Sequence, residues 1–177
     1  DESRRMFHFV DDIKASFPGV DVAITNDANA AAIGEGVFGN AKGMKDYVVI
    51  TLGTGLGSGI VSNGEMIYGH DGFAGEYGHV MVDSRVHGRE CGCGRKGCLE
   101  AYASATGIKR TAFELMAKMN NDSELREIPF SNFEAVMLSK AADKGDAIAL
   151  EAFRYTGEVL GKSLADLVAS TSPEAII

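Results

Sequence analysis

The chain has 177 residues, of which 45% are hydrophobic, and its 17 basic and 25 acidic side chains give a net charge of −8. This length and apolar content can bury the core of one domain or of pieces of two, and the acidic balance without a run of Lys or Arg argues against a nucleic-acid partner for this segment. No apolar run approaches the roughly 18 residues that a membrane helix needs, and no signal-peptide pattern opens the chain, so we expect a cytoplasmic protein with no membrane partner.

The first predicted elements are a helix and a strand. Apolar side chains recur at helical spacing up to Phe17, and Pro18 and Gly19 stop the pattern, so residues 3–17 are predicted to form an amphipathic helix. Residues 20–25 are then predicted to form a strand. Because the chain opens on Asp1, without an initiator Met and directly at the start of this helix, we expect it to be a piece of a longer protein.

A second helix is predicted directly after this strand. Asn26, Asp27 and Asn29 precede an alanine-rich run, which places short polar side chains at the N-terminus of a helix. Spacing alone favours a capping role for Asn26 or Asp27. The glycines of residues 34–39 are expected to end the helix.

A glycine-rich loop follows a strand that is predicted to be buried on both faces. Residues 47–52 form a nearly continuous apolar run, and glycine then occupies every other position from Gly53 to Gly59. The loop matches neither a Walker loop nor a dinucleotide-binding fingerprint, and a second strand ending in the hairpin signal Asn63-Gly64 comes after it. Such a loop between antiparallel strands can offer backbone N–H groups and a hydroxyl to a phosphate, and a plain glycine-rich hairpin is the alternative.

The last third of the chain is predicted to be helical. Helices are expected at residues 101–119, 131–142 and 146–170, and Ser131 with Glu134 matches the capping-box pattern. Gly157 and Gly161, four residues apart in the last helix, would leave a smooth patch for close packing. These helices are expected to act as scaffold or subunit interface, and residues 173–177 resemble the entry to a buried strand.

All three cysteines lie within eight positions. Cys91, Cys93 and Cys98 alternate with glycines that let the backbone fold tightly around an ion, and an odd number of cysteines suits a metal better than disulfides. A structural zinc site needs a fourth ligand, for which the sequence offers His79 or His87, and spacing does not choose between them. Three free buried thiols are the alternative.

Two carboxylates lie close in sequence to these metal-ligand candidates. Glu76 precedes His79 by three residues, and Glu100 follows Cys98 by two. A zinc that ties the two segments together would bring both carboxylates to one place, where they could accept hydrogen bonds from a polyhydroxylated ligand. The alternative is that both are solvated charges or helix caps.

Four motifs, taken in this order, resemble the ROK family of bacterial sugar kinases and sugar-responsive repressors, within the actin-like ATPase superfamily. They are Asn26-Asp27-Ala28-Asn29, residues 51–60, residues 75–79, and residues 91–100. The resemblance covers residues 20–177. It implies an α/β protein with an incomplete actin-like ATPase (ribonuclease H-like) fold, a zinc-binding loop and C-terminal helices. Residues 1–44 would be the remaining part of the N-terminal lobe, and residues 45–177 the truncated larger lobe with the phosphate loop, the sugar site and the zinc site.

The resemblance also implies an activity, the ATP-dependent phosphorylation of a hexose at its 6-hydroxyl, with glucose as the first choice. Asp27 would be the general base, and the sugar would be held by Asn26, Asp27, Glu76, His79 and Glu100. Zinc, in a structural role, would be bound by His79, Cys91, Cys93 and Cys98. Gly53, Thr54, Gly55 and Gly57 would face the phosphoryl group of ATP with its Mg²⁺, and Thr54 is the expected hydroxyl.

The chain departs from the family pattern in two places. The first phosphate hairpin of the family and its adenosine-binding glycine segment are not present, so we expect kinase activity in the parent protein and none in the isolated chain. A sugar-sensing transcriptional repressor that binds sugar without turnover is the second hypothesis. A zinc-stabilised carbohydrate-binding module is the third, against which the glycine loop argues. The family also suggests a homodimer.

Overall fold

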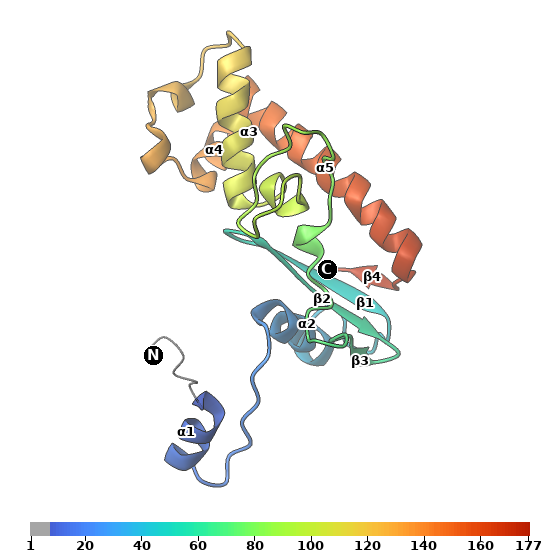
Figure 1. Ribbon diagram of the computed structural model, residues 1–177. Helices are drawn as coiled ribbons and strands as arrows, with labels where there is room; N and C mark the ends of the chain where they lie inside the picture. The colour runs from blue at the N-terminus through green and yellow to red at the C-terminus, as the bar shows by residue number, and fades with distance from the viewer. Residues whose placement is uncertain (1–7) are drawn as a thin grey trace.

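The computed structural model describes residues 8–177 (Figure 1). A four-stranded sheet lies between a helix from the N-terminal part and a cluster of helices from the C-terminal part. The elements are α1 (Phe9–Ser16), α2 (Asp27–Phe38), β1 (Tyr47–Leu52), β2 (Leu56–Ser62), β3 (Glu65–Met66), α3 (Ala105–Lys118), α4 (Ala135–Asp143), α5 (Ala147–Thr171) and β4 (Ala175–Ile176), with short 3₁₀ turns between them. None of the helices in the described part combines the length and apolar character needed to cross a membrane.

The sheet has the strand order β3-β2-β1-β4. β1 and β2 are antiparallel, with Leu52 opposite Leu56, and β4 pairs parallel to β1. β2 and β3 form a hairpin through Asn63 and Gly64, whose φ angles of 53° and 80° are those of a type I′ turn. The strand over residues 47–52 and the Asn63-Gly64 hairpin are therefore confirmed. Only the first three residues of β1 are buried, and Leu52 at its end is 57% exposed.

The glycine-rich stretch is shorter as a loop than predicted. β2 begins at Leu56, so only residues 53–55 form the turn, and Gly57 and Gly59 lie in the strand. A Cβ on Gly57 would lie 2.9 Å from the Cβ of Ala28, and one on Gly59 would lie 2.6 Å from the Cβ of Ala32. The alternating glycines therefore let α2 pack directly on β2.

α2 begins as predicted and ends later. The side chain of Asn26 caps the helix by accepting the N–H of Ala28 at 2.8 Å. Only Gly39 ends the helix, and Gly34 and Gly36 lie inside it. At Gly36 a side chain would overlap the hydroxyl of Tyr47. That hydroxyl donates a hydrogen bond to a carbonyl of α2, so glycine leaves room for it.

The predicted strand at residues 20–25 is wrong. These residues form no strand, and Val20 and Ile24 are 57% and 61% exposed. A strand needs a neighbour for its N–H and C=O groups, and no strand of the described sheet lies beside this segment, which stands apart from the sheet together with α1 (Figure 1). α1 covers Phe9–Ser16 of the predicted helix at residues 3–17, and residues 3–7 lie outside the described part.

The C-terminal helices pack around one apolar cluster. Its buried members come from α3, α4, α5 and the connection between α3 and α4, and include Ile108, Leu125, Phe133, Leu138 and Ile148. α5 starts after its cap Asp146, close to the predicted start. α3 begins at Ala105, later than predicted, because residues 99–101 form a 3₁₀ turn and Ser104 supplies the cap.

Two details of these helices differ from the prediction. Ser131 does not cap α4, since residues 130–132 form a 3₁₀ turn and Glu134 precedes the helix. Phe133, which is 3% exposed, packs in the core against Phe113, and the chain is extended at Phe133 and Glu134, inside the predicted helix. Gly157 and Gly161 are exposed, and an added Cβ on either would meet nothing within 4 Å in the described part of the chain.

Candidate functional site

The cysteine loop, residues 83–98, is closed by backbone hydrogen bonds. The N–H groups of Val82 and Asp83 both donate to the carbonyl of Gly97, at 2.8 and 3.1 Å. Gly97 has a φ of +78°, and a Cβ there would overlap the carbonyl of Asp83. Only glycine fits this crossing, and Cys98 is held directly beside it.

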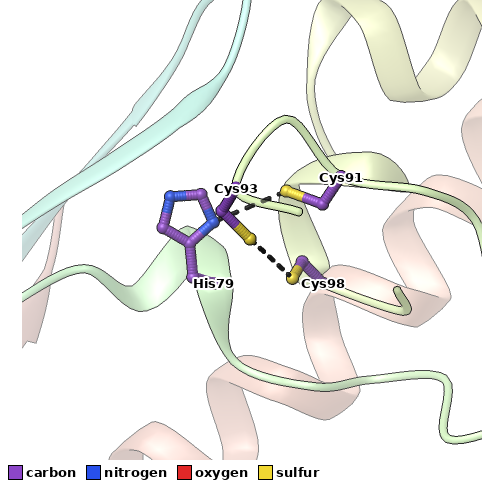
Figure 2. Close-up of side chains that lie close together, drawn as sticks. All are labelled: His79, Cys91, Cys93 and Cys98. Carbon is purple, nitrogen blue, oxygen red and sulfur yellow. Dashed lines mark hydrogen bonds between the residues drawn. The ribbon is translucent and has the colours of Figure 1, made fainter. Parts of the chain in front are cut away.

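The four predicted metal ligands converge (Figure 2). His79 Nδ1 lies 3.6 Å from the Sγ of Cys91, the Sγ atoms of Cys93 and Cys98 are 3.7 Å apart, and all four donor atoms lie within 4.8 Å of one another. Sulfurs at this distance are thiols, since a disulfide measures about 2.05 Å. Tetrahedral zinc with bonds of about 2.3 Å to sulfur requires sulfurs about 3.8 Å apart, so the donor set fits the ion. His87 is exposed and outside this group.

The pKa values of the three thiols shift in different directions. A hydrogen bond from the backbone of Arg95 lowers the pKa of Cys93 to about 6. Burial raises the pKa of Cys98 to about 12 and also raises the pKa of Cys91. Cys93 therefore loses its proton more readily than Cys91 and Cys98, whose protons metal binding would have to displace.

Arg89 anchors the loop to α3. Its side chain, only 9% exposed, forms a bidentate ion pair with Glu114 at 3.0 and 2.9 Å. The guanidinium also donates to the carbonyls of Ala101 and Gly107, at 3.1 Å each, and stacks 4.5 Å from the ring centre of Tyr102. The cysteine loop is thus attached to the C-terminal helices by a nearly buried side chain that makes four hydrogen bonds.

Asp83 continues this network. Its carboxylate accepts a hydrogen bond from the hydroxyl of Tyr102 at 2.6 Å and is paired with Arg85 at 2.8 Å. The Arg85 guanidinium, followed by the Tyr102 hydroxyl, holds the pKa of Asp83 well below its ordinary value. Sequence reasoning missed Asp83, Arg89 and Tyr102, because no motif or periodicity links residues that meet only through the fold.

The two predicted sugar carboxylates both adjoin the thiol cluster. Glu76 Oε2 lies 3.9 Å from His79 Nε2, so one ring nitrogen faces the thiols and the other faces Glu76. Glu100 accepts the N–H of Leu56 at 2.9 Å through Oε2, and its Oε1 lies 3.7 Å from the Sγ of Cys91. His79 and Glu100 therefore each connect the four-donor cluster to another part of the site.

The glycine turn, residues 53–55, is built against Glu100. A Cβ on Gly55 would lie 2.3 Å from the Oε2 of Glu100, so a larger residue would displace this carboxylate from its hydrogen bond with Leu56. Thr54 is exposed, and its carbonyl accepts a hydrogen bond from the hydroxyl of Thr106 in α3 at 3.0 Å. The turn and Glu100 border a cavity of about 410 Å³ that also reaches Cys91.

Asn26 and Asp27 lie at the start of α2, the helix that packs on Gly57 and Gly59 of β2. Asp27 is exposed, and its Oδ1 accepts the N–H of Ala28 at 2.9 Å. Within residues 8–177, no hydrogen bond or ion pair joins Asp27 to Glu76, His79 or Glu100. The packing of Ala28 on β2 fixes the position of the first turn of α2, and therefore the position of Asp27.

Comparison with known proteins gives this geometry a family context. The ROK family model matches residues 2–177. A glucokinase of Halalkalibacterium halodurans is 42% identical over 160 residues, which are 88% of this chain and 47% of that protein. An N-acetylglucosamine repressor of Escherichia coli O157:H7 is 32% identical over 87% of this chain and 36% of its own length. The chain spans about half the length of the curated glucokinases that it matches.

A solved structure agrees with the sequence matches. A ROK family glucokinase from Streptomyces griseus, in complex with glucose and AMPPNP, superposes with a TM-score of 0.81 at 37% identity, over 94% of this chain and 54% of that one. The sheet and helices described above are thus part of the actin-like ATPase α/β fold, and the resemblance found in the four sequence motifs is confirmed. The chain belongs to the ROK family.

Proposed function

We propose that the full-length protein containing this chain is an ATP-dependent hexose kinase that phosphorylates the sugar 6-hydroxyl, with glucose as the first substrate to test. One observation carries the proposal. His79 and Glu100 link the four-donor cluster to the acidic side chain of Glu76 and to the glycine turn, which places carboxylates suited to sugar hydroxyls beside a turn suited to phosphate. The glucokinase relatives support this assignment.

Asp27 is the proposed general base. It takes the proton of the sugar hydroxyl as the new bond from oxygen to the γ-phosphorus forms and the bond from that phosphorus to the leaving ADP oxygen breaks. Its exposed carboxylate has one hydrogen bond, to Ala28, which leaves lone pairs free for a substrate proton.

The other predicted residues hold the substrates. Asn26, Glu76, His79 and Glu100 would bind sugar hydroxyls. Gly53, Thr54, Gly55 and Gly57 would belong to the phosphate side, where the turn of residues 53–55 presents backbone N–H groups and the Thr54 hydroxyl to the transferred group. ATP would arrive with Mg²⁺, which neutralises phosphate charge when bound.

Zinc is the proposed structural ion of the cluster formed by His79, Cys91, Cys93 and Cys98. The four donors fill a tetrahedral shell, so such an ion has no open position for water activation. It would cross-link the 3₁₀ turn that carries His79 to the cysteine loop. Glu76 lies beside His79, and Glu100 lies beside Cys91, so this cross-link would also fix the positions of both carboxylates.

A sugar-sensing repressor is the second candidate, supported by the N-acetylglucosamine repressor relatives. It would use the same sugar and zinc residues without turnover. A DNA-binding segment elsewhere in the full-length protein would support it. Either protein would be cytoplasmic and could form a homodimer, and residues 1–44 and 45–177 would belong to its N-terminal and larger lobes.

Turnover with and without Asp27 tests the proposal. The full-length protein should phosphorylate glucose with ATP, and Asp27→Ala should lower kcat by about 100- to 10,000-fold while sugar affinity, measured by calorimetry, stays within a few-fold. Asp122→Ala, which removes an exposed carboxylate outside the site, is the control. Equal turnover of Asp27→Ala would remove Asp27 from its role, and a wild-type protein that binds but phosphorylates no hexose would favour the repressor. The isolated 177-residue chain should show no kinase activity.

A further inference from the structure

Asn29 carries a buried amide that the described fold does not use. The residue is 4% exposed, and its Oδ1 is fully buried without a hydrogen-bond partner within residues 8–177. Its backbone N–H is engaged in the helix cap by Asn26, so only the side chain lacks a partner. Buried polar atoms are nearly always paired, so an unpaired amide in a well-packed helix points to a partner supplied in another state of the protein.

The turn of residues 75–77, which carries Glu76, passes beside this amide. A Cβ on Gly75 would lie 4.0 Å from the Oδ1 of Asn29 and 3.1 Å from the carbonyl of Ser58. Ser58, which is 4% exposed, holds the turn through its hydroxyl, donating to the carbonyl of Gly75 and accepting the N–H of Tyr77 at 3.2 Å. The turn therefore lies against both Ser58 of β2 and Asn29 of α2, and only Ser58 is bonded to it.

Donors for Asn29 are present in the same turn. In the described part of the chain, the structure records no acceptor for the backbone N–H of Gly75 or of Glu76. Glu76 itself is exposed, and in residues 8–177 its carboxylate is paired with His79, at 3.9 Å. The 4.0 Å separation is measured from the position of a Cβ on Gly75, so one of these N–H groups reaches the Oδ1 of Asn29 only if the turn moves or rotates toward α2.

We propose that Asn29 is a positioning residue for sugar binding, whose amide oxygen accepts a backbone N–H of the turn at residues 75–76 when a hexose is bound by Glu76. Free of sugar, the turn is held to β2 by the hydroxyl of Ser58 and to α5 by the hydroxyl of Tyr77, which donates to the carbonyl of Ser163. With sugar, the added bond fixes the Glu76 carboxylate toward the ligand, and Asn29 itself touches no substrate atom. This inference rests on the proposed function, because it requires that the site takes a hexose.

The test compares two alanine variants in the full-length protein. Asn29→Ala should leave the melting temperature of the sugar-free protein unchanged or slightly higher, because the amide removed there has no partner. It should weaken glucose binding by about 10-fold in calorimetry and raise KM similarly, with kcat within about threefold. Ser58→Ala, which removes two existing hydrogen bonds, should lower the melting temperature of the sugar-free protein.

The outcomes separate this inference from the proposed function. A wild-type protein that binds no hexose contradicts both. If the wild type binds glucose and Asn29→Ala binds it equally well, or loses stability without losing affinity, Asn29 is only structural and the inference fails. Hydrogen exchange on the wild type provides a measurement independent of any variant: glucose should protect the amides of residues 75–76, and unchanged protection under saturating glucose would overturn the proposal.

Discussion

The cysteine loop and the start of α2 are assembled in different ways. The thiols of the loop come from eight consecutive positions, and they meet His79 with all four donor atoms within 4.8 Å. Asn26 and Asp27, by contrast, are exposed at the end of a helix, and their position depends on how α2 lies on β2. A local site can form from its own loop, whereas the proposed catalytic carboxylate depends on packing between distant segments.

The cysteine loop and the start of α2 should therefore respond to different substitutions. Loss of one ligand should dismantle the metal cluster and leave the sheet intact, because the sheet has its own apolar cluster around Tyr47, Val49 and Val61. One methyl group added to a β2 glycine that faces α2 should displace Asn26 and Asp27. The alternating glycines of β2 leave no room for a side chain between the strand and the helix. The two sites can therefore be perturbed independently.

Cys93→Ser should have the largest effect. The wild-type protein should contain about one zinc equivalent by elemental analysis, and the variant none. Structural zinc contributes about 10–16 kcal/mol in small zinc domains, and even a fraction of this, about 3 kcal/mol, would lower the melting temperature clearly. His87→Ala, which removes an exposed histidine outside the cluster, should keep the metal. Well-folded wild-type protein without metal would contradict the zinc assignment.

Gly59→Ala should damage the other region. The new Cβ would lie 2.6 Å from the Cβ of Ala32 and 2.9 Å from the carbonyl of Ala28, so α2 has to move. Overpacking of this kind costs about 1–3 kcal/mol, measured as a shift of the denaturation midpoint. Sugar binding should also weaken, because Asn26 moves with the helix, while the zinc content should stay at the wild-type level. Loss of zinc in this variant would show that the two regions are not independent.

The metal cluster was the part of the site most accessible from sequence, for a physical reason. Cysteines are otherwise absent from this chain, and glycines between them are needed for a tight loop, so composition and spacing together indicate a metal site. The family motifs supplied the fold class and Asp27. The spacing around Glu76 and Glu100 could suggest only that they meet, and the structure adds that His79 and Leu56 are their partners.

The errors came from interactions between distant segments. The segment at residues 20–25 has strand composition, but a strand also requires a neighbour, which composition does not report. Ser131 matches a capping box, but burial of Phe133 decides where the next helix begins. Sequence periodicity also does not predict the partners of Arg89, which lie on other elements of the fold. Nor does it predict that the side-chain oxygen of Asn29 is buried without a partner in residues 8–177.

Asp83→Asn tests how the cysteine loop is attached to the C-terminal helices. The pKa of Asp83 is depressed by Arg85 and Tyr102, so its stabilisation is complete above its ordinary pKa of 3.8 and is lost as the pH falls below that value. The variant should be less stable than wild type by about 1–2 kcal/mol at pH 7, and the difference should shrink as denaturation is measured from pH 5 down to pH 3. Asp122→Asn, at an exposed site, should show no such trend. A difference independent of pH would mean that the carboxylate charge is not what stabilises the loop.

Gly34→Ala should have the smallest effect and the opposite sign to Gly59→Ala. Gly34 lies inside α2, and an added Cβ there meets nothing within 4 Å in the described part of the chain, so the substitution adds no clash. It removes backbone freedom from the unfolded chain, and alanine in a helix interior is favoured over glycine by about 0.5–1 kcal/mol. The denaturation midpoint should therefore rise slightly, with glucose binding and zinc content unchanged. A destabilised Gly34→Ala protein would mean that the outer face of α2 is packed as tightly as its inner face, and the contrast between the two glycines would then be lost.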